Sequence, residues 1–151
     1  MIADKLRQLG LVLPTTPAPL ANYVTFVISG NLLFLSGQGP KAAEGDWLRG
    51  KVGAEVSREE AYRHARLTGL RLLAVAQGAL GSLDRIQRVV KVLGFVNSVP
   101  EFREHPQVIN GCSDLFVEVW GDAGRHARSA VGVGSLPENI TVEIEAIFEI
   151  R

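Results

Sequence analysis

The sequence predicts an α+β fold in which two amphipathic helices cover one face of a β-sheet. Three observations support this prediction. Two neighbouring β-rich segments lie near the N-terminus, two long segments carry apolar residues at helical spacing, and the closing segment alternates between apolar and polar residues. With 46% hydrophobic and 21% charged residues the composition is globular, and 151 residues suit one domain over 1–151.

The first segment, residues 1–20, predicts a short helix followed by a proline-rich connector. Leucines recur there at roughly helical spacing, and three prolines then prevent regular backbone hydrogen bonding. These residues are Leu6, Leu9, Leu13, Pro14, Pro17 and Pro19.

A β-hairpin is predicted next, because the β-rich segments 23–29 and 32–37 flank the turn pair Gly30-Asn31. The polar, glycine-bearing segment 41–53 then predicts a loop that leads to a short strand near Val52.

The two helices have recognisable ends. Ser57 and Glu60 fit a capping box at the start of the first helix, and Gly81 is expected to end it. The second helix is expected to start near Pro106 and to end at Gly121. Its predicted buried stripe consists of Val108, Ile109, Cys112, Leu115, Phe116 and Val119.

Three further strands are predicted, over residues 86–96, 128–133 and 141–150. The first has one face formed by Val90, Val92 and Val96 and another formed by Val89, Leu93 and Phe95, so both faces are expected to be buried. Two helices can cover only one face of the sheet. We therefore expect a second copy of the chain to cover the other face.

Composition also excludes several classes of protein. Sixteen basic and sixteen acidic residues give a formal charge of zero, which argues against coating nucleic acid or an anionic membrane. No segment is apolar enough to span a membrane, the N-terminus does not resemble a secretion signal, and the single cysteine excludes an internal disulfide. A cytoplasmic protein is expected.

The three histidines and the single cysteine are expected to be structural or surface residues, not metal ligands or nucleophiles. His64, His105 and His126 are far apart in sequence, so a metal site is not predicted. His64 lies beside arginines and is expected on a solvated helix face. Cys112 falls on an apolar helical stripe, where a buried, inert thiol is favoured over a nucleophile.

Two segments are stronger functional candidates. Residues 124–137 place Arg128 where a loop enters a strand among small residues, and a guanidinium fork suits a carboxylate. Spacing alone nevertheless favours a surface arginine paired with a glutamate. Residues 142–150 carry three carboxylates on one strand face. If another subunit covers that face, burial would raise the pKa of one of these carboxylates, which would suit it to acid–base catalysis. Spacing does not bring Arg128 and Glu143 together.

Three segments of the chain carry a resemblance to a known family: NYVTFVISGNLLFLSGQGP, VVKVLGFVNSVPEF and ARSAVGVGSLPENITVEIEAI. Together they resemble the YjgF-type Rid family of enamine/imine deaminases, also labelled endoribonuclease L-PSP-like. The resemblance runs from about Tyr23 to the C-terminus. It implies a chorismate-mutase-like mixed sheet with two helices on one face. It also implies a homotrimer with ligand pockets in the clefts between subunits.

The resemblance also implies roles for individual residues. Arg128 matches the arginine that binds the substrate carboxylate, and Glu143 matches the glutamate that positions the attacking water. Ala130 replaces a cysteine of the best-known branch, where that position contributes a backbone N–H. Other matched pocket positions are Tyr23, Ser36, Gly37 and Asn110.

The predicted activity is cofactor-independent hydrolysis of 2-imino or enamino acids to 2-keto acids and ammonia, without a metal. The alternative is a non-catalytic trimer that binds small carboxylates or acts as a chaperone. Endoribonuclease or translation-inhibitor activity is less favoured, because no basic stripe with interleaved aromatic residues is visible.

Overall fold

The computed structural model describes residues 1–15, 22–43 and 45–151. Its helices are α1 (Ile2–Gln8), α2 (Arg58–Leu80) and α3 (His105–Trp120), with short 3-10 turns η1 (Leu83–Arg85), η2 (Gly121–Gly124) and η3 (Pro137–Asn139). Its strands are β1 (Phe26–Ser29), β2 (Leu32–Gln38), β3 (Ile86–Asn97), β4 (Ala127–Val133) and β5 (Val142–Ile150).

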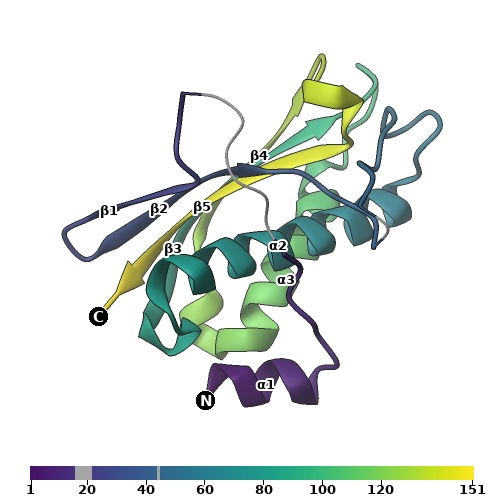
Figure 1. The fold of residues 1–151 in the computed structure, drawn as a ribbon. Helices are drawn as coiled ribbons and strands as arrows, with labels where there is room; N and C mark the ends of the chain where they lie inside the picture. Colours follow the sequence, from purple (N-terminus) through teal and green to yellow (C-terminus); the bar gives the residue numbers. More distant parts are fainter. Residues whose placement is uncertain (16–21, 44) are drawn as a thin grey trace.

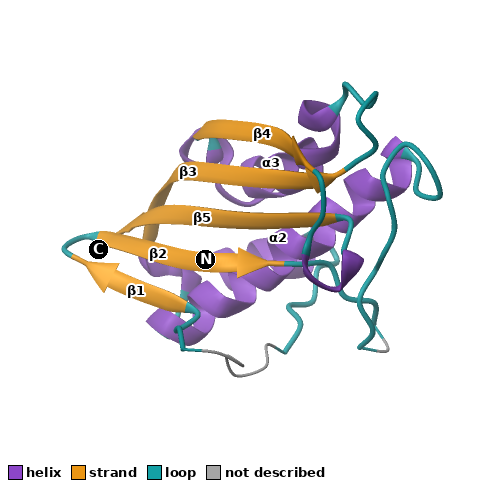
Figure 2. Cartoon of the chain, turned by 90° about the horizontal axis from the view of Figure 1, so that it is seen from above, coloured by secondary structure: helices purple, strands orange, loops and turns teal. Residues whose placement is uncertain are grey.

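The five strands form one sheet in the order β1-β2-β5-β3-β4. Neighbouring strands are antiparallel except for β3 and β4, which are parallel, so the sheet is mixed. Helices α2 and α3 lie side by side across one face of this sheet, and none of the described helices lies on the other face (Figures 1 and 2). The predicted α+β class is therefore confirmed.

The ends of both long helices follow the predicted signals. The Ser57 hydroxyl accepts a hydrogen bond of 3.1 Å from the Glu60 backbone N–H, and Gly81 ends α2 in the left-handed conformation at φ 79°. Pro106 lies in the first turn of α3, and Gly121 caps its C-terminus. The predicted stripe of α3 is entirely buried and forms much of the core against the sheet.

Within one chain, β3 has one fully buried face and one half-buried face. The pairing of β3 with β5 shifts between Val89 and Lys91, which places Val89 with Val92 and Val96 in the core beneath the helices. Val90 therefore does not share the face predicted for it. On the opposite face Leu93 and the residues beside it are only half-buried.

That opposite face, here called the open face, remains partly apolar at the surface. Val27, Phe34 and Val131 on β1, β2 and β4 are 52%, 38% and 42% exposed. The expectation that a second copy covers this face therefore remains a prediction, now with named side chains.

The prediction of a strand near Val52 was wrong. Val52 forms only isolated bridges, to Val56 and Ser98. Gly50 and Gly53 flank it at φ 129° and 93°, so an extended ladder cannot continue on either side.

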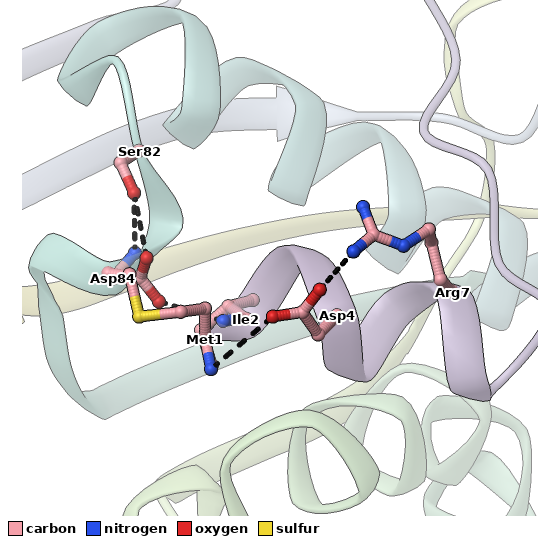
Figure 3. A network of polar contacts seen from close by, with 6 residues as sticks. All are labelled: Met1, Ile2, Asp4, Arg7, Ser82 and Asp84. Atoms are coloured by element: carbon pink, nitrogen blue, oxygen red, sulfur yellow. Dashed lines mark hydrogen bonds and ion pairs between the residues drawn. The ribbon is translucent and has the colours of Figure 1, made fainter.

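The N-terminal helix is shorter than its leucine spacing suggests. Leu6 is buried in the core, while Leu13 lies beyond the end of α1; Pro17 and Pro19 lie outside the described residues. The Ile2 backbone N–H donates to Asp84 Oδ1 at 2.7 Å and so fastens α1 to η1, as Figure 3 shows. Within the described residues, no helix is long and apolar enough to cross a membrane.

Candidate functional site

Arg128 lies on the edge strand β4 and is directed toward α3. Its Nη1 group donates to Asn110 Oδ1 at 2.8 Å and to Ser113 Oγ at 3.1 Å. The side chain is half-buried, and it forms no ion pair with any residue that the structure describes. The surface arginine–glutamate pair that spacing favoured is therefore not present among these residues.

The hydrogen bonds of Arg128 leave one side of its guanidinium group available. Both Nη1 protons are taken by α3, whereas Nε and Nη2 donate to none of the described residues. These two nitrogens carry parallel N–H groups that match the two oxygens of a carboxylate. Arg128 is thus oriented by α3 and still able to bind a carboxylate in a bidentate manner.

Ser113 and His126 extend this network, and neither residue was predicted from the sequence to belong to the site. Ser113 follows Asn110 by one helical turn, a spacing that could have identified it as a second partner for Arg128. His126 contacts Ser113 Oγ through Nε2 at 2.8 Å and the Gly124 carbonyl oxygen through Nδ1 at 2.6 Å. Burial lowers the pKa of His126, the hydrogen bond to Gly124 opposes this shift, and the charge of Arg128 adds to it.

Ala130 shares the α3-facing side of β4 with Arg128. The two residues pair with Gly94 and Val92 of β3, and both β3 residues are buried beneath the helices. Ala130 is half-buried and packs against the core. Because β4 is an edge strand, alternate backbone N–H groups along it are not used by the β3 ladder.

Glu143 lies on the open face of β5. It pairs with Phe95 of β3 and stands between the fully buried Val142 and Ile144, whose side chains point to the helices. Burial raises the pKa of the half-buried Glu143 carboxyl above its ordinary value, and the charge of Glu145 raises it further. A carboxylate with a raised pKa is suited to exchanging protons with substrate or water.

Gly37 makes room for this carboxylate. A Cβ atom at Gly37 would lie only 2.8 Å from Glu143 Oε2, so any side chain there would displace the carboxylate. The neighbouring Ser36 hydroxyl donates to the Val24 carbonyl oxygen at 2.6 Å. Tyr23, which precedes Val24, is 53% exposed.

The seven predicted site residues therefore fall into two groups within one chain. The first group, here called the arginine group, contains Asn110, Arg128 and Ala130 on the α3-facing side. The second, here called the glutamate group, comprises Tyr23, Ser36, Gly37 and Glu143, of which Gly37 and Glu143 are in contact on the open face. A single chain does not bring the two groups together.

The other two histidines and the cysteine occupy structural positions. His64 is half-buried, with Nδ1 2.8 Å from Thr141 Oγ1, so its predicted placement on a solvated face was wrong. His105 contacts Ser98 Oγ at 3.3 Å. Cys112 is fully buried, as predicted, and burial raises the pKa of its thiol strongly. Among the described residues, no three potential ligands are grouped around a common point.

Comparisons with known proteins agree with the fold and with the resemblance. Residues 3–148 match the family described as "YjgF/chorismate_mutase-like, putative endoribonuclease". "Protein TCP17" of Trypanosoma cruzi is 46% identical, covering 99% of this chain and 94% of that protein. A "2-iminobutanoate/2-iminopropanoate deaminase" of Dermatophagoides farinae is 31% identical, covering 91% and 93%.

A solved structure from Shewanella oneidensis, titled a "putative endoribonuclease", has the same fold. It superposes with a TM-score of 0.95 at 33% identity and covers 99% of both chains.

Proposed function

Because the chain belongs to the family described as "YjgF/chorismate_mutase-like, putative endoribonuclease", we propose that it is a cofactor-independent deaminase of 2-imino and enamino acids. The observation that carries this proposal is Arg128, which α3 orients through Nη1 while Nε and Nη2 stay available for a carboxylate. The similarity to a deaminase of imino acids supports the same substrate class.

The active unit in this proposal is a homotrimer. Arg128 and Glu143 occupy opposite faces of the sheet in one chain, so one copy alone cannot present both groups to a small substrate. The arginine group of one copy would meet the glutamate group of the next in a cleft between them. The exposed apolar side chains of the open face support such an assembly.

The reaction follows from the chemistry of the two groups. Arg128 binds the carboxylate of the substrate, and the backbone N–H of Ala130 adds a directional hydrogen bond. Glu143 accepts a proton from water as the water oxygen bonds to the C=N carbon, which gives a carbinolamine. By the end of that step the proton has passed from Glu143 to the substrate nitrogen. The carbinolamine hydroxyl then loses its own proton to Glu143, which gives it to the same nitrogen. The C–N bond breaks as the C=O bond forms, and ammonia and the 2-keto acid leave. Orientation and one acid–base group, the latter worth ~10²–10⁴-fold, suffice for a bond that water already hydrolyses.

A coupled assay tests this proposal. An amino-acid oxidase generates 2-imino acids, and semicarbazide competes with the purified protein to trap them. The wild type should lower the yield of semicarbazone. Arg128→Ala removes two charge-assisted hydrogen bonds and should reduce kcat/KM by roughly 10²- to 10⁴-fold. Arg128→Lys keeps the positive charge without the paired N–H groups, so its kcat/KM should lie between those of the wild type and Arg128→Ala. Equal turnover by wild type and Arg128→Ala would refute the mechanism.

The same preparation separates the alternatives. Binding of 2-oxobutanoate without hydrolysis of small, aliphatic, aromatic or acidic imines would identify a carboxylate-binding protein instead. RNA cleavage that survives extensive purification and is lost in Arg128→Ala would identify a ribonuclease, although the zero formal charge argues against it.

A further inference from the structure

The guanidinium of Arg128 is held by a chain of hydrogen bonds that continues past its direct partners. Arg128 Nη1 donates to Ser113 Oγ at 3.1 Å, Ser113 Oγ lies 2.8 Å from His126 Nε2, and His126 Nδ1 lies 2.6 Å from the Gly124 carbonyl oxygen. The chain therefore runs from the proposed substrate-binding side chain to a fixed backbone carbonyl.

The chemistry of the partners fixes the direction of each bond. A carbonyl oxygen only accepts, so His126 Nδ1 must carry a proton and donate it to Gly124. In the neutral ring Nε2 is then an acceptor, so the Ser113 hydroxyl donates to it. The Ser113 oxygen is left to accept from Arg128, which has no acceptor of its own. Every donor in the chain thus has an acceptor.

The ring of His126 has little freedom to leave this position. It packs edge-on against Phe116 of α3, with ring centroids 6.0 Å apart and planes at 74°. Asn110 holds the second Nη1 proton of Arg128, so two α3 side chains one turn apart fix the plane of the guanidinium group. The orientation of Nε and Nη2 depends on that plane.

We propose that Ser113 and His126 are positioning residues, which fix the guanidinium plane of Arg128 so that its Nε and Nη2 protons meet a substrate carboxylate. This inference rests on the proposed function of Arg128. His126 acts only through Ser113, and neither residue touches the substrate. The proposal makes two independent predictions, one about a proton and one about binding.

The first prediction concerns the tautomer of His126. Nitrogen NMR of the imidazole ring at pH 8, where the lowered pKa leaves the ring neutral, should show Nδ1 protonated and Nε2 as an acceptor. This measurement requires neither substrate nor turnover. A neutral ring protonated at Nε2 would overturn the proposed chain, even if the deaminase activity were established.

The second prediction concerns affinity for 2-oxobutanoate, measured by calorimetry on the assembled protein. Ser113→Ala removes one hydrogen bond to Arg128 and should raise Kd and KM by about 2- to 10-fold while kcat changes little, because Glu143 is untouched. Ser113→Thr keeps the hydroxyl and should restore binding. His126→Phe keeps the packing on Phe116 and should weaken binding less than Ser113→Ala does.

A double variant distinguishes positioning from general destabilisation. If His126 acts only through Ser113, then Ser113→Ala combined with His126→Phe should bind like Ser113→Ala alone. The proposal would be overturned if the rise in Kd of the double variant equalled the product of the rises in the two single variants. It would also be overturned if kcat in Ser113→Ala fell by the same factor as KM rose. His64→Phe is the matched control, because His64 is also half-buried against a hydroxyl, and it should leave Kd unchanged. Failure of the wild type to bind 2-oxobutanoate would refute the proposed function and, with it, this inference.

Discussion

Arg128 and Glu143 lie on opposite faces of the same sheet. Arg128 pairs with Val92 of β3, which is buried under the helices, whereas Glu143 pairs with Phe95, which belongs to the open face. Their paired positions on β3 are three residues apart, roughly 10 Å along the strand. Any reaction that uses both side chains on one small molecule therefore requires two copies of the chain.

The first prediction concerns this assembly. Phe34 on β2 is 38% exposed on the open face, between its strand neighbours Val27 and Ile147. Phe34→Glu would place a charge where an apolar contact between copies is expected, and burying an unpaired charge is strongly unfavourable. The variant should sediment as a monomer and lose deaminase activity, while the wild type sediments at three times the chain mass.

The control for this experiment is Leu67→Glu. Leu67 on α2 is 36% exposed, nearly as much as Phe34, but α2 covers the opposite face of the sheet. This variant should keep both the mass and the activity of the wild type. A wild-type monomer that is fully active would contradict the two-copy site.

The second prediction concerns the space beside Glu143. Gly37→Ala places a methyl group 2.8 Å from Glu143 Oε2, so the carboxylate must shift. A misplacement of about 1 Å at a catalytic group lowers turnover by up to roughly 100-fold. We expect kcat to fall by roughly 10- to 100-fold while the chain still folds.

Gly78→Ala provides the comparison, at an exposed position of α2. A Cβ at Gly78 meets no atom within 4 Å, and replacing a helical glycine by alanine stabilises a helix by roughly 1 kcal/mol. Chemical denaturation should show this gain in the free energy of unfolding, with kcat unchanged. An equal loss of activity in both variants would remove the special role of the space at Gly37.

The helices and most strands could be predicted from local sequence signals, but the tertiary contacts between them could not. Ser57, Gly81 and the stripe of α3 each act through neighbours a few residues away, so spacing is enough to place the helices. The buried face of β3 depends on a register shift at Val89, which arises from pairing with β5, more than fifty residues later.

The same distinction applies to the candidate site. Arg128 and Glu143 were identified because their motifs match a family, yet their separation by the sheet follows only from strand order and register. Neither Ser113 nor His126 could be assigned to the site from the sequence, because a serine on a helix and a histidine before a strand are recognisable as partners of Arg128 only once tertiary packing brings them to it.

The third prediction concerns the cap of α2. Ser57→Ala removes the hydroxyl that accepts from the Glu60 backbone N–H, and loss of such a cap costs about 1 kcal/mol. The free energy of unfolding should fall by about this amount in denaturant titrations at fixed protein concentration. Ser57→Asp, which restores an acceptor, should recover most of it. An unchanged free energy of unfolding in Ser57→Ala would mean that this cap does not contribute to the stability of the protein.

The fourth prediction concerns pH. Glu143 must be ionised to accept a proton from water, and burial and the charge of Glu145 raise the pKa of Glu143 above its ordinary value. Activity should therefore rise with pH through that raised pKa, and this acid limb should be absent from whatever activity remains in Glu143→Gln. Because the shift favours the protonated form in the folded state, the stability lost through Glu143 grows between its unfolded pKa and its raised folded pKa and stays constant at higher pH.

Glu145→Gln tests the cause of the shift without altering Glu143. Removing the neighbouring negative charge lowers the pKa of Glu143, so the acid limb of kcat should move to lower pH. Glu149→Gln, on the same face but farther along β5, is the matched control and should leave the limb in place. A limb that moves to higher pH in Glu145→Gln would show that another group is the base, because loss of a negative charge can only favour ionisation of a carboxyl nearby.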